Sequence, residues 1–148
     1  MAELVEAVED LIHEPTQVRD DGGIDLTVTE VYEITEAGRV DFGGGELEPA
    51  DCEPHPRFWR NEDDDYQWWD LDAGTYLLEY NETLTAGAEL QPRIEILERG
   101  ATHPSLRVEE LPRVPLTVAG AGLRIKENAR VSTLLPLGST VDRMTSPG

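Results

Sequence analysis

The chain has 148 residues, 39% of them hydrophobic, with three Trp, four Tyr and two Phe, so we expect one folded domain rather than a disordered acidic chain. Its 31 Asp and Glu oppose 12 Lys and Arg, and this formal charge of −19, with Lys126 as the one lysine, argues against nucleic acid as a partner and favours a high-salt cytoplasm over an ordinary acidic protein. No run of 18 apolar residues could span a membrane and the acidic N-terminus is unlike a signal peptide, so we expect a soluble, cytoplasmic protein.

The N-terminal third contains one helical pattern and one strand pattern. Residues Ala2–His13 place apolar side chains at helical spacing, and Pro15 is expected to end this short amphipathic helix. A turn signal at Asp20–Gly23 follows, and Ile24–Tyr32 then alternates apolar and polar residues, which predicts a strand with one buried face.

The segment between Gly38 and Asp70 is rich in Gly, Pro and acids, so only short strands are expected there. The run Asp63–Asp65 lacks the spacing of a calcium-binding loop and is interpreted as a solvated acidic loop. The lone cysteine, Cys52, excludes an internal disulfide, and with His55 it gives only two metal ligands where structural zinc needs four, so we interpret it as structural.

The C-terminal half consists of short strand patterns separated by Gly or Pro turns, which predicts a β-sandwich or barrel. These patterns are Tyr76–Tyr80, Arg93–Leu97, Leu116–Val118, Leu123–Ile125 and Arg130–Leu135. We expect a single domain over residues 1–137, followed by a mobile tail over residues 138–148. His103 lies beside Pro104 without an identifiable partner and is expected at the surface.

Four local matches, in order along the chain, resemble the dUTPase/dCTP deaminase superfamily, especially its archaeal dUTPase-like members. They are Gly23–Leu26, Leu71–Leu84, Pro92–Ala101 and Leu123–Leu134. The resemblance implies a mostly β, dUTPase-like β-clip with the short N-terminal helix, and it implies a homotrimer. It also implies a site for deoxyuridine or deoxycytidine triphosphate with a divalent ion, Mg²⁺.

The resemblance assigns roles to particular residues. Asp25 would hold the metal and triphosphate as a catalytic residue, while Asn81, Glu82 and Arg93 would contact the nucleotide. The family's third motif, which supplies an aspartate base, is absent between Thr102 and Leu116, so Glu109 or Glu110 is the candidate for the base.

Three residues depart from the phosphate-binding motif. The family has two serines after the arginine and often a second arginine further on, whereas this chain has Ile94, Glu95 and Glu98. Isoleucine donates no hydrogen bond and the two glutamates repel phosphate. The lone nearby cation, Arg99, is expected on the opposite face of a strand.

Three functional readings therefore remain. The first is a dUTPase- or dCTP-deaminase-like protein of pyrimidine deoxynucleotide metabolism with a degenerate active site. The second is a catalytically inactive family member that serves as a trimeric sensing or protein-interaction module. The third sets the resemblance aside and leaves a β-sandwich interaction domain, because fold analogy alone does not settle function.

Overall fold

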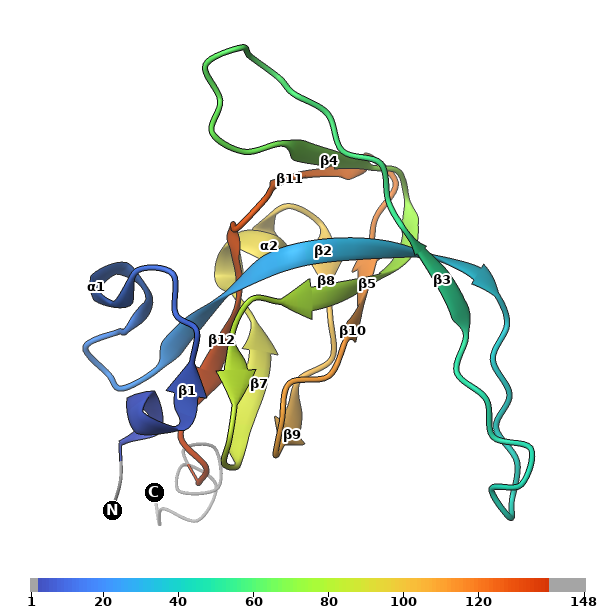
Figure 1. Cartoon of the computed structure of the whole chain (residues 1–148), viewed down its shortest axis with the longest axis horizontal. Helices are drawn as coiled ribbons and strands as arrows, with labels where there is room; N and C mark the ends of the chain where they lie inside the picture. Colours follow the sequence, from blue (N-terminus) through green and yellow to red (C-terminus); the bar gives the residue numbers. More distant parts are fainter. Residues whose placement is uncertain (1–2, 139–148) are drawn as a thin grey trace.

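The structure, a computed structural model, describes residues 3–138, which form a curled, mostly β body with an arm projecting from it (Figure 1). The predicted fold class, a mostly β dUTPase-like β-clip, is confirmed. Within the described residues, no helix is both long and apolar enough to cross a membrane. The predicted tail begins at Gly138, and its remaining residues, 139–148, lie outside the described part.

One large sheet organises the molecule, and its strands follow the order β8-β10-β5-β2-β12-β7-β9, with β3 paired to β2. The strands of this sheet are β2 (Ile24–Glu36), β3 (Asp51–Pro54), β5 (Gly74–Tyr80), β7 (Ala88–Pro92), β8 (Ala101–Thr102), β9 (Leu106–Val108), β10 (Val114–Val118) and β12 (Arg130–Leu135).

Strand β2 is longer than its alternating pattern predicted and joins the two halves of the sheet. Its first residues pair with β12 and its later residues pair with β5. The register shifts between Val28 and Glu30, and such an irregularity bends a strand and increases its twist. The sheet therefore curls around a core whose fully buried side chains include Leu26, Leu78, Leu116 and Leu134.

Two small sheets close the ends of the body. Strand β1 (Val8–Glu9) pairs with β6 (Thr83–Leu84), and β4 (Trp68–Leu71) pairs with β11 (Leu123–Lys126). The expectation of short strands between Gly38 and Asp70 is met by β3 and β4.

The predicted helix over Ala2–His13 is wrong in extent. Its apolar residues are divided between a 3₁₀ turn, η1 (Leu4–Ala7), and β1, and Asp10 has a positive φ of 67° that a helix cannot accommodate. Pro15 begins rather than ends a helix, because α1 (Glu14–Gln17) has this proline in its first turn. Ala2 lies outside the described residues. Pairing of Val8 with Leu84 competes successfully with the local helical spacing.

The predicted strand over Arg93–Leu97 is also wrong, because these residues form the helix α2 (Ile94–Glu98). Only Ile96 of this helix is buried, while Ile94 and Leu97 are exposed. The turn ends at Gly100, whose φ of 83° favours glycine. Reasoning about Arg99 from the alternating faces of a strand therefore does not apply.

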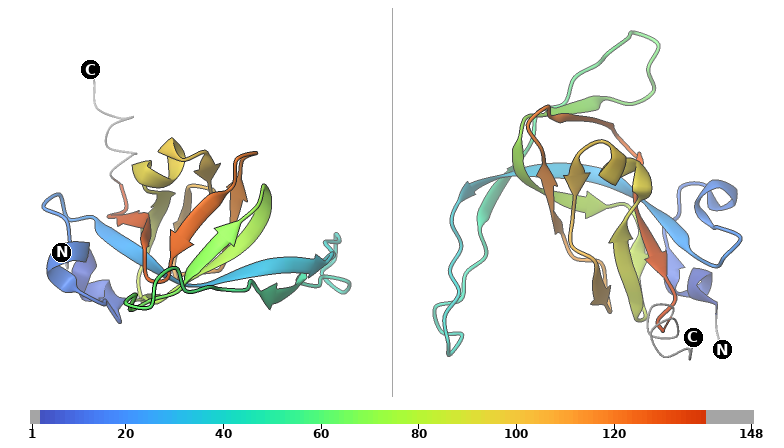
Figure 2. Two further views of the ribbon diagram at one scale, coloured as in Figure 1. Left: turned by 90° about the horizontal axis from the view of Figure 1, so that it is seen from above. Right: turned by 180° about the vertical axis from the view of Figure 1, so that it is seen from behind.

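A long hairpin leaves the body where β2 continues past β5. We call residues 33–54 the β2–β3 arm, and two further views show it pointing away from α2 and from the N-terminal segment (Figure 2). A second loop, between β3 and β4, carries the acidic run, of which Asp63 and Asp65 are exposed.

Candidate functional site

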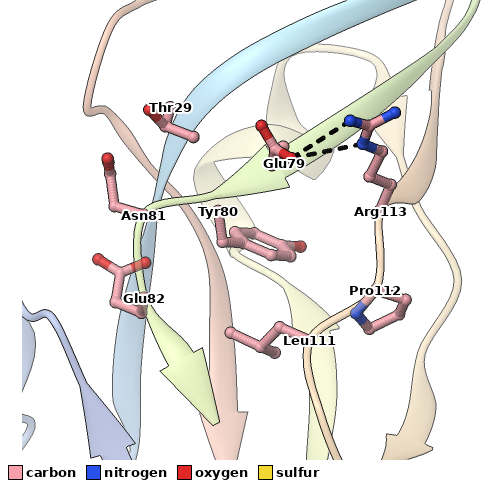
Figure 3. A pocket seen from close by; sticks show the side chains of 8 residues that line it. All are labelled: Thr29, Glu79, Tyr80, Asn81, Glu82, Leu111, Pro112 and Arg113. Atoms are coloured by element: carbon pink, nitrogen blue, oxygen red, sulfur yellow. Dashed lines mark hydrogen bonds and ion pairs between the residues drawn. The ribbon is translucent and has the colours of Figure 1, made fainter. Parts of the chain in front are cut away.

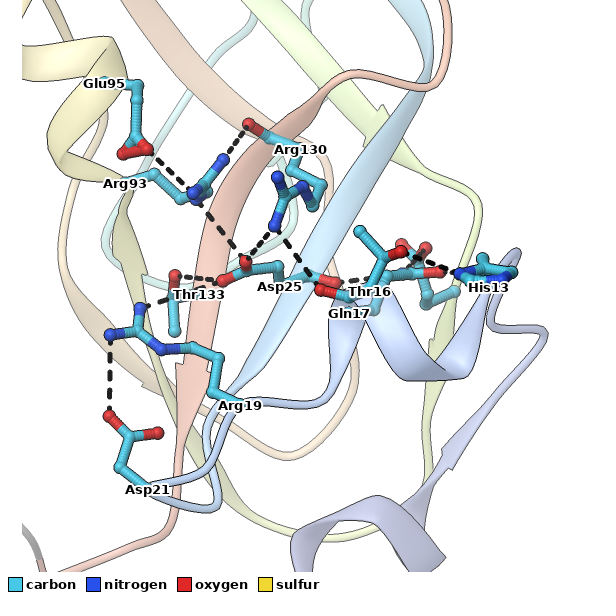
Figure 4. Close-up of polar contacts among 11 residues, drawn as sticks. His13, Thr16, Gln17, Arg19, Asp21, Asp25, Arg93, Glu95, Arg130 and Thr133 are labelled. Carbon is cyan, nitrogen blue, oxygen red and sulfur yellow. Dashed lines mark hydrogen bonds and ion pairs between the residues drawn. The ribbon is translucent and has the colours of Figure 1, made fainter.

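Asp25 on β2 lies at the centre of a cluster of three arginines (Figure 4). The residue is 2% exposed, and its Oδ2 accepts a hydrogen bond from Arg130 Nη1 at 3.1 Å. Arg93 Nε lies 3.6 Å from the same oxygen, and Arg19 Nη1 lies 3.8 Å from Oδ1. Thr133 Oγ1 donates to Oδ1 at 2.9 Å. A buried carboxylate requires such partners, so the cluster is a built feature of the fold.

The strand register explains why these side chains meet. Thr133 stands opposite Asp25 across the β12–β2 pair, and Arg130 stands opposite Thr27. Arg93 follows β7 directly, and β7 is the other neighbour of β12. Arg19 enters from the turn that precedes β2. Three segments far apart in sequence thus deliver their arginines to one carboxylate.

The cluster forms one wall of an open pocket of about 410 Å³. Its lining residues are Thr16, Val18, Arg19, Asp20, Asp25, Arg93, Ile94, Glu95 and Arg130. Two acids compete here for the arginines: Glu95 Oε2 lies 2.7 Å from Arg93 Nη2, and Asp21 Oδ2 lies 3.5 Å from Arg19 Nη2. An anionic ligand would compete with these carboxylates for Arg93 and Arg19, whereas the ion pair of Arg130 is with the buried Asp25.

Glu82 and Asn81 were predicted to contact nucleotide, and both belong to a buried polar network beside Asp25. Glu82 is 4% exposed and accepts hydrogen bonds from Thr27 N at 2.9 Å, Thr27 Oγ1, and Gln17 Nε2 at 2.8 Å. Burial raises the pKa of the Glu82 carboxyl above its ordinary value, against the opposing effect of these hydrogen bonds. Asn81 Nδ2 donates to Thr27 Oγ1 at 2.9 Å.

Gln17 joins this network to the arginine cluster, because its Nε2 also donates to the backbone oxygen of Asp25 at 2.9 Å. Neither Gln17 nor Arg19 lies in a matched motif, so no sequence signal pointed to them. Arg130 and Thr133 lie in the last matched segment, and a buried aspartate on the neighbouring strand is what gives them their role.

A second pocket, of about 330 Å³, has Thr29, Asn81 and Glu82 along one side (Figure 3). Leu111, Pro112 and Arg113 form its far wall, and Arg113 Nε lies 3.4 Å from Glu79 Oε1. The predicted site residues are therefore divided, because Asp25 and Arg93 line one pocket while Asn81 and Glu82 line another.

The two candidate bases, Glu109 and Glu110, are exposed. Glu109 Oε1 lies 3.8 Å from Arg107 Nη2, in a pair whose side chains are 72% and 67% exposed. Neither glutamate lines the pocket at Asp25 or the second pocket. The catalytic role of either glutamate therefore stays a prediction.

The expectation of a surface histidine at position 103 is wrong, because His103 is 4% exposed. Its Nε2 lies 2.7 Å from Ser132 Oγ, which lies 2.6 Å from Tyr80 Oη, and its Nδ1 lies 2.9 Å from the Pro104 oxygen. Nδ1–H therefore donates to the carbonyl, Ser132 donates to Nε2, and Tyr80 donates to Ser132. Burial lowers the pKa of His103 and raises that of Tyr80, so both side chains are held neutral.

The residues around Asp25 do not fit a protein-held Mg²⁺. Magnesium requires oxygen ligands in octahedral geometry, whereas both Asp25 oxygens are already engaged by cations or a hydroxyl donor. No cluster of three or more His, Cys, Asp or Glu in residues 3–138 could hold a metal ion. Cys52 is free and half-buried, and Arg113 Nη1 donates to its sulfur at 3.4 Å.

Sequence comparison places the chain among known proteins. It is 30% identical over 137 residues to a probable deoxyuridine 5′-triphosphate nucleotidohydrolase of Methanosarcina acetivorans, covering 86% of this chain and 76% of that protein. A protein of the same name from Methanosarcina mazei is 28% identical over the same coverage. No protein-family model matches the chain. The identity, its extent and the mostly β fold show that the chain belongs to the deoxyuridine 5′-triphosphate nucleotidohydrolase (dUTPase) family, as a divergent member.

Proposed function

We propose that this protein binds a pyrimidine deoxynucleoside triphosphate, with dUTP as the first candidate, and turns it over slowly because its site is degenerate. The observation that carries the proposal is the convergence of Arg19, Arg93 and Arg130 on Asp25 at the wall of an open pocket. Guanidinium groups suit phosphate oxygens because they present several donors in a planar arrangement. The names of the Methanosarcina relatives point to dUTP as the substrate.

The degenerate character is inferred from what surrounds Arg93. Ile94, the next residue, lines the pocket and offers no donor. Glu95 Oε2 lies 2.7 Å from Arg93 Nη2, so Glu95 competes with a phosphate oxygen for this edge of the guanidinium. A phosphate that displaces the Glu95 carboxylate from Arg93 loses the free energy of that ion pair, which weakens binding. The charge of Glu95 also repels the ligand.

We further propose that any Mg²⁺ enters bound to the triphosphate rather than to Asp25. The role left to Asp25 is to orient Arg93 and Arg130, which it does through its Oδ2. The residues around Asp25 do not supply ligands for the metal, because both carboxylate oxygens of Asp25 are already engaged.

The second candidate function is a catalytically inactive, trimeric sensing or protein-interaction module. The exposure of Glu109 and Glu110 favours it, since a base must lie within hydrogen-bond reach of the water that it activates. The two candidates share one fold and differ in whether the nucleotide is turned over.

The deciding experiment measures binding and turnover of dUTP and dCTP in molar KCl. Arg93→Ala should weaken dUTP binding by at least about tenfold, the loss expected when a charged hydrogen-bond donor is removed. Arg124→Ala is the matched control, because Arg124 is 72% exposed, pairs with Asp70 and lies outside the pocket. Circular dichroism establishes that both variants are folded. Binding without turnover would select the inactive member as a sensing module. Absence of binding would reject the proposed nucleotide site and leave the protein-interaction module.

A further inference from the structure

The short helix α1 is held on the body by a polar side chain. Of its four residues, Glu14–Gln17, only Gln17 is buried, and the other three are exposed. The helix therefore buries no apolar side chain, although burial of an apolar face is what usually fixes a helix against a sheet. The position of α1 must depend on hydrogen bonds instead.

The Gln17 amide uses its full capacity for hydrogen bonds, which is two donated and two accepted. Its Nε2 donates to the backbone oxygen of Asp25 at 2.9 Å and to Glu82 Oε2 at 2.8 Å. Its Oε1 accepts from the backbone nitrogens of Ile12 at 2.7 Å and His13 at 2.8 Å. The bond to Asp25 ties α1 to β2 at the residue whose carboxylate lies at the centre of the arginine cluster.

Arg130 is the arginine of the cluster that α1 contacts (Figure 4). Its Nη1 donates to Asp25 Oδ2 at 3.1 Å and also lies 3.4 Å from the backbone oxygen of Thr16, to which it donates. The Arg130 side chain is 38% exposed, so burial alone does not fix its direction. One contact from β2 and one from α1 direct it, and Gln17 follows Thr16 in the chain.

The other two arginines are placed without α1. Arg19 belongs to the turn Arg19–Gly23, in which its backbone nitrogen and oxygen make hydrogen bonds of 2.8 and 3.0 Å. Arg93 follows β7, and its backbone nitrogen donates to the oxygen of Val131 on β12 at 3.1 Å. A displacement of α1 should therefore disturb Arg130 and leave Arg93 where it is.

We propose that Gln17 is a positioning residue for the nucleotide site. By anchoring α1 to the backbone of Asp25, it holds the Thr16 oxygen against Arg130 and so directs this guanidinium at the pocket wall. A side chain that is directed before the ligand arrives loses less conformational entropy on binding. The inference rests on the proposed function, because it assigns Arg130 to the phosphates. Gln17 itself does not line the pocket and acts through Arg130.

A double-mutant cycle tests whether Gln17 acts through Arg130. Gln17→Met keeps the approximate size of the side chain and removes all four hydrogen bonds of the amide. In molar KCl it should weaken the binding of dUTP and of inorganic tripolyphosphate by at least about threefold, part of the net contribution of one hydrogen bond to a charged group. In an Arg130→Ala background the same substitution should have no further effect, whereas in an Arg93→Ala background its effect should persist.

Val118→Ala is the matched control for a general loss of stability. Val118 is 3% exposed on β10 and lies outside the pocket, so this variant should unfold at lower urea and keep the wild-type Kd for dUTP. Amide hydrogen exchange provides a readout without nucleotide, because Gln17→Met should exchange faster over residues 12–18 with β12 unchanged. Should Gln17→Met fail to fold, Gln17→Asn replaces it, since its shorter amide cannot reach Asp25 and the backbone of Ile12 together.

The outcomes separate this inference from the function on which it rests. A wild type that binds neither dUTP nor tripolyphosphate would reject the proposed function, and the inference with it. A wild type that binds dUTP no more tightly than the Gln17 variants would reject the inference alone. Equal weakening by Val118→Ala, or an effect of Gln17→Met that persists in the Arg130→Ala background, would likewise overturn the positioning role.

Discussion

Glu95→Gln should increase the affinity for dUTP, because Glu95 neutralises the arginine that we assign to the phosphates. The substitution keeps the size of the side chain and removes the charge that lies 2.7 Å from Arg93 Nη2. Arg93 keeps its contact with Asp25 at 3.6 Å, so its guanidinium stays at the pocket wall with one edge released.

The size of the effect follows from the exposure of the pair. Two unit charges about 4 Å apart attract by about 4 kcal/mol at an effective dielectric near 20. The Glu95 side chain is 41% exposed, so solvent screening reduces this to about 1 kcal/mol, as for other partly exposed pairs. That energy corresponds to roughly fivefold tighter binding. The gain should shrink as KCl is raised, because the Debye length falls to about 3 Å at 1 M.

Isothermal titration calorimetry of wild type, Glu95→Gln and Glu62→Gln with dUTP provides the measurement. Glu62 is exposed in the loop before β4 and serves as the matched control, because its loss changes the net charge equally without touching Arg93. Tighter binding by Glu95→Gln alone supports the assignment. Equal gains in both variants would show a general charge effect, and no gain in either would refute the role given to Arg93.

Three further outcomes are expected. Asp25→Asn should lower the free energy of unfolding in urea by about 3 kcal/mol, because it leaves the surrounding arginines without their buried counter-charge. A change below about 1 kcal/mol would show that the charge of Asp25 contributes little to stability. Stability should fall as pH drops below the ordinary pKa of histidine near 6.5, because the lowered pKa of His103 means that the unfolded chain binds the proton first; a His103→Gln variant should lose that part of the pH dependence, and an unchanged pH profile would contradict it. Circular dichroism should report loss of secondary structure in tens of millimolar salt, where a charge of −19 is screened only beyond roughly 10 Å; an unchanged spectrum would argue against salt adaptation.

The sequence by itself determined those strands in which the two-residue alternation of apolar and polar side chains does not also fit a helix. Ile24–Tyr32, Tyr76–Tyr80 and Arg130–Leu135 all lie within strands of the structure. Short strands separated by turn residues were enough to predict the mostly β class. The ordered motif matches were enough to identify the family, which the comparison with the Methanosarcina proteins supports independently.

Local pattern failed where two structures fit the same residues. The spacing of Ala2–His13 suits a helix, yet pairing of Val8 with Leu84, 76 positions away in the numbering, decided for a strand at that point. Arg93–Leu97 contains two isoleucines and alternates like a strand, yet it turns as a helix between β7 and β8, with Ile96 buried. In both cases long-range contacts outweighed the local preference.

The site shows the same division. The sequence pointed to Asp25 and Arg93, because both stand in recognisable motifs. Only the tertiary structure brought Arg19 and Arg130 to the same carboxylate, since their contacts with it depend on which strands are neighbours in the sheet. Likewise His103 could be recognised as buried only once β12 supplied Ser132 as its partner. Burial and charge pairing are properties of the packed sheet, and no residue's neighbours in sequence can specify them.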